Sequence, residues 1–326
     1  MLITPSTRRR RVIPLLAVSA TVAVVGAFAI DAVTASAQTV TATQQQSRNW
    51  AGYIVQSSTG KSFSSVSGSW KQPATSSSSP DQGYSAFWVG LGGASGQSQS
   101  LEQVGTSADW VNGQAQYYAW YELVPSAQVK LNIAISPGDQ ISGKVTVSGT
   151  TVTISLSDQT TGQSVTNSLQ MSNPDTSSAE WIAEAPSAAV QPGVYQTLPL
   201  ANFGTATFTG LSATADGHTG SISDPSWSVQ QVQLSPTATA GDAGGGGSFT
   251  PAGLGGGSSS SSGASTSNIS SDGSSFSVSY APTPSSAQSS TAGSGSSGYD
   301  SWGGYGDQGY GYGYGYGYDG QSAYTY

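Results

Sequence analysis

The sequence contains no cysteine among its 326 residues. This absence excludes disulfide bonds, cysteine nucleophiles and metal sites built from thiolates, so the chain must stabilise its fold by burying a sizeable core. Histidine is almost as scarce, because His218 is the only one. A Ser-His-Asp mechanism would have to use His218, and no nucleophile-elbow motif is present. That mechanism and a histidine-based zinc site are therefore both disfavoured.

Charged residues are also few, at 8% of the chain, with 9 basic and 17 acidic residues. Removal of the N-terminal segment described below takes away four arginines and one aspartate, which leaves 5 basic and 16 acidic residues and a net charge of −11. This balance argues against a nucleic-acid partner, which needs a basic surface. It fits a secreted protein that stays folded in acid, because protonation breaks few ion pairs. Solubility alone would also explain it.

The first 37 residues have the pattern of a secretory signal peptide. Four arginines at 8–11 precede an almost wholly apolar run over 12–30, and Ala35-Ser36-Ala37 offers a small-residue cleavage site. We expect cleavage after Ala37, a short leader over 38–47 and secretion of the remaining chain. The apolar run also approaches the length of a membrane span, so an uncleaved anchor is the alternative.

Residues 48–282 are predicted to form one all-β domain. From Arg48 to Ser235, short runs rich in Val, Ile, Thr, Tyr and Trp alternate with period two between Gly, Ser, Asn and Pro turns, and no amphipathic helix is evident. Lys144–Val147 and Thr151–Leu156, for example, alternate around a predicted hairpin turn at 148–150. Many short strands in one long domain predict a β-sandwich of two antiparallel sheets.

Two stretches of low complexity interrupt and follow this domain. Residues 236–271 are rich in Gly, Ser, Thr and Ala, and we expect them to be a disordered insertion because they bury too little surface to order themselves. The strand pattern returns at Phe276–Tyr280. Residues 283–326 end in a Gly-Tyr repeat over 309–318 and are predicted to form a disordered tail. Its rings could stack on a polysaccharide or cell surface, or the tail could be a plain extension.

The segment SAEWIAEAP, from Ser178 to Pro186, places two glutamates four residues apart. In a strand, Glu180 and Glu184 point to one face and Trp181 to the other, with about 13 Å between the backbones of the two glutamates. Strands disfavour glutamate unless something is gained, so the pattern indicates a functional face, although two solvated acids would also explain it. Two chemistries are open: a glycosidase that uses both carboxyls, or one glutamate that acts on a water beside a separate oxyanion donor.

Four further motifs precede this segment in the chain. They are Asn49–Tyr53 (NWAGY), Phe87–Gly93 (FWVGLGG), Ser100–Gly105 (SLEQVG) and Tyr117–Pro125 (YYAWYELVP). With AEWIAE after them, the ordered set resembles the glutamic peptidases, the eqolisin family G1. The resemblance covers Asn49 to Leu234 and resumes at Phe276–Tyr280. It implies a concanavalin A-like sandwich of two curved antiparallel sheets, of the lectin and glucanase type, with a substrate groove.

The resemblance also implies a secreted, acid-active endopeptidase that needs no cofactor or metal. The catalytic glutamine of the family falls on Gln103, as oxyanion stabiliser, and the catalytic glutamate on Glu184, as general base and acid on a water. Trp88, Glu122 and Glu180 are expected to bind substrate or support the dyad, and Glu180 could raise the pKa of Glu184 by like-charge repulsion. The implied partners are polypeptide substrates, with a monomer as the expected state and no membrane contact after signal cleavage.

Two alternatives remain open from the sequence. One is a glycoside hydrolase that uses Glu180 and Glu184, and the other is a non-catalytic sandwich that binds carbohydrate or a surface. Gln103 distinguishes the peptidase from both alternatives, because only the peptidase needs the Gln103 amide. The chain also departs from the family pattern: Leu91–Ser95 stands where fungal members have acidic residues, and Tyr118 stands where an acid is expected before AWYE.

Overall fold

The computed structural model describes residues 41–76, 82–94, 98, 100–191, 194–238 and 262–282. All regular structure in these residues is β, and they contain no helix long and apolar enough to cross a membrane. The strands are β1 (Thr43–Ser47), β2 (Trp50–Ser57), β3 (Phe63–Lys71), β4 (Gln82–Gly83), β5 (Ala86–Gly92), β6 (Leu101–Val111), β7 (Gln114–Val124), β8 (Val129–Lys130), β9 (Gln140–Ser148), β10 (Thr151–Asp158), β11 (Gln163–Gln170), β12 (Ser178–Glu184), β13 (Ser187–Gln191), β14 (Val194–Thr197), β15 (Thr205–Ala215), β16 (His218–Gly220), β17 (Trp227–Leu234), β18 (Gly263–Thr266) and β19 (Ser275–Ala281).

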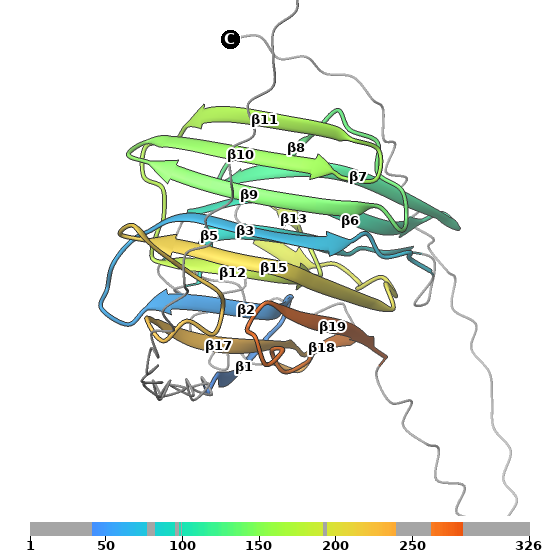
Figure 1. Cartoon of the computed structure of the whole chain (residues 1–326). Coiled ribbons are helices and arrows are strands. Elements are labelled where there is room, and N and C mark those ends of the chain that lie inside the picture. The colour runs from blue at the N-terminus through green and yellow to red at the C-terminus, as the bar shows by residue number, and fades with distance from the viewer. Residues whose placement is uncertain are drawn as a thin grey trace, which may run out of the picture. The chain divides into compact units, whose positions relative to one another are not determined.

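The strands form two packed layers. One layer has the order β8-β7-β6-β5-β12-β2-β17-β1, and the other has the order β11-β10-β9-β3-β15-β19-β18. Every pairing within them is antiparallel except β1 with β17. The layers join where β18 pairs with β17, and Figure 1 shows the strands of both layers curving around the core. The predicted sandwich of two curved antiparallel sheets is thus confirmed.

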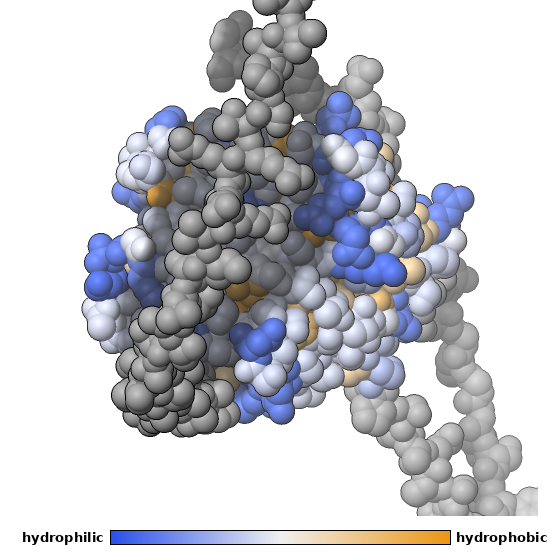
Figure 2. Space-filling model, in the orientation of Figure 1, coloured by the Kyte–Doolittle hydropathy of each residue, from blue (hydrophilic) through white to orange (hydrophobic). Residues whose placement is uncertain are grey.

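The period-two pattern of the sequence decides which side chains enter the core. Along β10, Val152, Ile154 and Leu156 are buried, while the residues between them are half-buried on the outer side. There, hydroxyl pairs such as Thr153 with Ser168 (3.1 Å) connect neighbouring strands. The predicted hairpin is present, with β9 and β10 joined by a two-residue turn. On the side seen in Figure 2, the visible described residues are mostly polar, as this alternation requires.

Two buried tryptophans connect the layers. The Trp181 indole of β12 donates to the Ser67 carbonyl of β3 (2.8 Å), and the Trp70 indole of β3 donates to the Thr106 hydroxyl of β6 (2.9 Å). A buried indole N–H needs such an acceptor. Gly68 makes room for Trp181, because a Cβ at that position would lie 2.8 Å from the ring carbon Cδ1. The core therefore fixes the rotation and register of β12.

Two ordered strands lie where the sequence predicted none. β1 falls within the expected leader, and β18 falls within the Gly/Ser-rich insertion expected to be disordered. Both strands pair with β17, and β18 also pairs with β19. Main-chain hydrogen bonds therefore provide the stabilisation that the small side chains of these strands cannot provide by burial. The expected signal peptide (1–37), residues 239–261 and the tail (283–326) lie outside the described residues.

The space beside Trp181 gives a test of the packing. Gly68→Ala should lower the free energy of unfolding by about 1–3 kcal/mol, because the added methyl overpacks a ring that cannot move. Ser65→Ala, on the same strand, serves as control and should change stability by less than about 0.5 kcal/mol. Urea unfolding followed by tryptophan fluorescence measures both. Equal stability of the two variants would contradict the proposed packing.

Candidate active site

The two faces of β12 lie in different environments. Trp181 and Ala183 belong to the main core, whereas Ile182 belongs to a smaller aromatic cluster on the opposite face. Glu180 and Glu184 share the face of Ile182, as the sequence predicted. We call this surface the site face. The cross-strand register adds further side chains to it: Trp50 from β2, Trp88 from β5, Gln103 from β6, and Tyr118, Trp120 and Glu122 from β7.

The Glu184 carboxyl is held by two donors. The Trp88 indole donates to Oε2 (2.7 Å), and the Asn49 amide donates to Oε1 (3.1 Å). Trp50 packs edge-on against Trp88, with 5.1 Å between ring centroids, and so fixes the donor ring. Burial raises the pKa of Glu184 to about 8; the hydrogen bond from Trp88 opposes this shift, and the nearby Glu122 carboxylate adds to it. The site therefore makes Glu184 a stronger base than an ordinary carboxylate.

Gln103 and Glu122 form a second polar pair. They lie opposite each other on β6 and β7, and Gln103 Nε2 donates to Glu122 Oε2 (2.8 Å). Burial raises the pKa of Glu122 to about 7, and the hydrogen bond from Gln103 opposes this shift. Gln103 is 4% exposed, and among the described residues its Oε1 has no donor. One N–H and the carbonyl oxygen of the Gln103 amide are thus left for another partner.

Gln103 and Glu184 are separated by two strand spacings and a shift of four residues, with about 16 Å between their backbones. The intervening strand carries Trp88, whose register partner on β6 is Gly105. A Cβ at Gly105 would lie 2.6 Å from Trp88 Cβ, so glycine is required there for Trp88 to reach Glu184. Glu122, the hydrogen-bond partner of Gln103, also acts electrostatically on Glu184.

Glu180 lies in a different setting from Glu184. It is fully buried, and its neighbouring carboxyls are Asp175 and Glu102. Neither of its oxygens has a donor at full hydrogen-bonding geometry among the described residues, and the nearby Ser178 hydroxyl only partly favours its charged form. Burial raises the pKa of Glu180 well above its ordinary value, and these two neighbours add to the shift. The carboxyl that raises the pKa of Glu184 by repulsion is thus Glu122 rather than Glu180, which was the residue expected from the sequence.

Two contributors were missed by sequence reasoning. Asn49 stands in the NWAGY motif, and its position next to a strand start gave no sign that its amide would reach Glu184 across the sheet. Glu102 is fully buried beside Gln103 in the chain, and burial raises its pKa to about 8, against a hydrogen bond from the Asp175 backbone N–H (3.1 Å). Only the three-dimensional register reveals either role.

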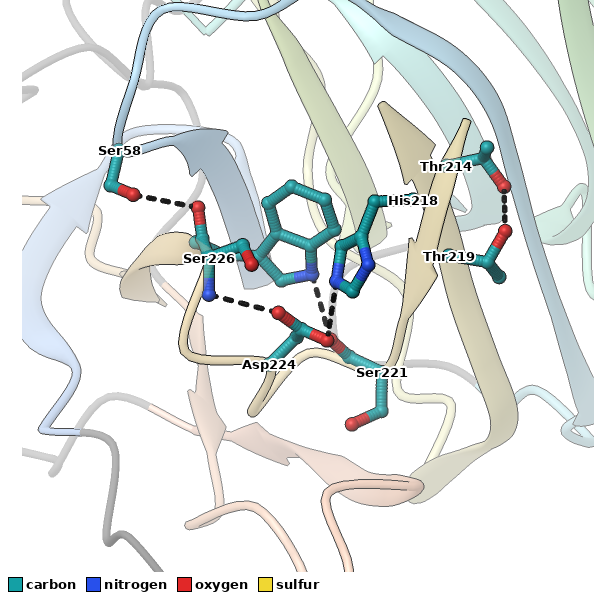
Figure 3. A network of polar contacts seen from close by, with 8 residues as sticks. Ser58, Thr214, His218, Thr219, Ser221, Asp224 and Ser226 are labelled. Carbon is teal, nitrogen blue, oxygen red and sulfur yellow. Dashed lines mark hydrogen bonds and ion pairs between the residues drawn. The ribbon is translucent and has the colours of Figure 1, made fainter. Parts of the chain in front are cut away.

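His218 takes no part in the site. Its Nε2 contacts Asp224 Oδ2 (2.9 Å) at the β15–β16 hairpin, and the Trp227 indole donates to the Ser221 carbonyl nearby (3.0 Å). Figure 3 shows the Ser221 hydroxyl pointing away from the His218 ring. A surface hollow of about 450 Å³ next to this hairpin is lined by Phe63 and Asp216, among others, and by none of the site residues. The arrangement is not that of a Ser-His-Asp triad.

A carboxyl of raised pKa that is held by two donors, with a glutamine amide on the same face of a curved sandwich, is the arrangement expected of a glutamic-type peptidase. Comparison with known proteins agrees: residues 48–250 match the Peptidase A4 family, and the chain belongs to that family. It is 30% identical over 233 residues to aspergillopepsin-2 of Aspergillus niger, and the aligned region covers 62% of this chain and 78% of that protein.

Two solved structures resemble most of the chain. One is scytalido-glutamic peptidase with a peptide-based transition-state analogue (26% identity, TM-score 0.53). The other is SCP-B, an eqolisin in complex with a tripeptide (26% identity, TM-score 0.52). Each match covers 72% of this chain and 98% of the solved one.

The family assignment confirms the resemblance found in the sequence. The protein is a hydrolase of the glutamic peptidase type, and its substrates are polypeptides. A glycosidase that uses Glu180 and Glu184 is not favoured, because Glu180 is fully buried and cannot meet a sugar. A purely binding sandwich is not favoured either, because the chain matches peptidases along most of the domain.

The buried carboxyls predict that stability falls as pH rises. Glu102 and Glu180 have folded pKa values above the unfolded value of about 4.3, so their stabilising effect is complete below that pH. The contribution of Glu102 is lost as pH rises through about 8, and that of Glu180 is lost as its own raised pKa is passed. Each ionising group contributes a slope of up to about 1.4 kcal/mol per pH unit. Urea unfolding between pH 4 and 8 should show this decline, and Glu102→Gln should make it less steep. Stability that increases with pH would contradict the assignment.

Proposed function

We propose that the chain is a secreted, acid-active endopeptidase in which Glu184 and Gln103 form the catalytic dyad. The observation that carries this proposal is the Glu184 carboxyl, held by Trp88 and Asn49 on the same face as the Gln103–Glu122 pair. Secretion is supported by the signal-peptide pattern of residues 1–37. No step of the mechanism requires a cofactor, and we expect the enzyme to work as a monomer.

Glu184 would act first as base and then as acid. Its carboxylate takes a proton from a water, and the water oxygen forms a bond to the carbonyl carbon of the scissile peptide. The tetrahedral intermediate then collapses, the C–N bond breaks, and Glu184 returns the proton to the leaving amine. Each oxygen of Glu184 accepts one hydrogen bond from the protein, which leaves lone pairs for the water.

Gln103 would stabilise the charge that develops on the carbonyl oxygen. One of its two amide hydrogens is engaged by Glu122, so the other can donate to the oxyanion, and Oε1 can accept from the attacking water. Glu122 fixes the orientation of this amide and is therefore a positioning residue. Trp88 would likewise orient Glu184, and the fully buried Glu180 would support the same face.

Substitution of the dyad gives the direct test. Gln103→Ala should lower kcat about 10²–10³-fold through loss of an oxyanion donor, and Glu184→Gln about 10²–10⁴-fold through loss of the base. The assay is proteolysis of a denatured protein between pH 2 and 7, with a chelator and an aspartic-protease inhibitor present. Asp216→Asn, which makes the same carboxyl-to-amide change at the β15–β16 hairpin outside the site, is the control and should keep its activity at pH 4. Undiminished proteolysis by either dyad variant would rule out the proposed mechanism.

The pH dependence offers a second test. Because the pKa of Glu184 is raised to about 8, few molecules hold the ionised base in acid, and kcat/KM should increase with pH over the acidic range. Glu122 is ionised only near and above its own pKa of about 7, so in that pH range Glu122→Gln removes a neighbouring negative charge and should lower the pKa of Glu184. The acid limb of the kcat/KM profile should then move to lower pH. An acid limb that stays in place or moves to higher pH would show that Glu122 does not tune the base.

A further inference from the structure

A group outside the dyad shares the site face with Glu184. Tyr118 on β7 lies in the same cross-strand row as Glu184, with Ala86 of β5 and Ser107 of β6 between them. Directly opposed residues on neighbouring strands point to the same face. Tyr118 and Glu184 therefore project from one surface, and the two side chains that separate them are small.

The ammonium group of Lys130 packs over the ring of Tyr118. Lys130 of β8 pairs with Trp120 and so belongs to the same face, and its ammonium lies 4.1 Å from the centroid of the Tyr118 ring. The Tyr118 hydroxyl donates to Asp109 Oδ2 (2.9 Å), which fixes the ring. A cation is attracted to an aromatic face at this distance. The charge is thus held at a defined place rather than on a free side chain.

The Lys130 ammonium still has hydrogen-bond donors to offer. It carries three N–H groups, and a ring face does not satisfy them as an acceptor would. Lys130 is exposed, and within the described ranges it forms no ion pair. Asp109, the carboxyl that acts on it electrostatically, is buried and accepts from the Tyr118 hydroxyl and the Ser85 backbone N–H. Two other lysines, Lys71 and Lys144, lie on the other layer.

We propose that Lys130, held over Tyr118, is a specificity-determining residue that recognises a carboxylate of the substrate. The inference rests on the proposed function, because it takes Glu184 to mark the scissile bond. Three strand spacings separate Glu184 from Tyr118, about 14 Å, which an extended peptide spans in about four residues. The favoured substrate carries its carboxylate at that distance from the scissile bond, on an acidic side chain or at a free chain terminus.

Matched peptides provide the experiment. Each has one scissile bond, carries Glu or Gln at one position two to five residues to either side, and ends in a free or an amidated C-terminus. At pH 5.5 the full-length enzyme should cleave the best Glu peptide with a kcat/KM about two- to fivefold above its Gln partner, the range of a partly exposed ion pair. The ratio should approach one at pH 3, where a carboxyl with a pKa of about 4.3 is protonated. A gain confined to free C-termini would identify the terminus as the source.

Two variants separate the inference from the proposed function. Lys130→Met should bring the ratio of kcat/KM for the Glu and Gln peptides to one and leave cleavage of the Gln peptides unchanged. Lys144→Met removes a matched charge from the other layer and should leave this ratio at the wild-type value. Equal ratios in wild type and Lys130→Met would overturn the inference alone. Failure of the wild type to cleave any peptide or a denatured protein would overturn the proposed function, and this inference with it.

Discussion

The position of Trp181 between the layers is the constraint on which the site depends. Its ring fills the space left by Gly68, and its N–H is satisfied by the Ser67 carbonyl across the core. Because side chains alternate along a strand, fixing Trp181 inward also fixes Glu184 outward. A slip of one residue in β12 would bury Glu184 and expose the ring. The Glu184 carboxyl thus takes its position from core packing rather than from a loop.

The two glutamates of β12 differ in the hydrogen bonds that their carboxyls accept. Glu184 receives donors from Trp88 and Asn49, whereas Glu180, on the same strand face, has none at full hydrogen-bonding geometry among the described residues. A carboxyl without donors is tolerable when it is neutral and costly when it is charged. The protein therefore combines one carboxyl whose charge is stabilised by hydrogen bonds with others that favour the neutral, protonated form.

Local pattern predicted much of this structure. Alternation identified the β9–β10 hairpin and the shared face of Glu180 and Glu184, and ordered motifs led to the family. The rest depends on pairing between distant segments. Trp88 meets Ile182 across β5 and β12, and the β1–β17 pairing joins the two ends of the domain. Neither the full burial of Glu180 nor the Gln103–Glu122 bond could be predicted, because no periodicity encodes which strands become neighbours.

The hydrogen bond between Trp88 and Glu184 has an optical consequence. Excitation of an indole shifts electron density across its rings, so its absorption and emission respond to the local electric field. Ionisation of Glu184 places a negative charge, shared between its two oxygens, beside the Trp88 ring, with Oε2 2.7 Å from the indole nitrogen. The absorption and emission of Trp88 therefore depend on the protonation state of Glu184, and the chain contains an intrinsic spectroscopic probe of that carboxyl.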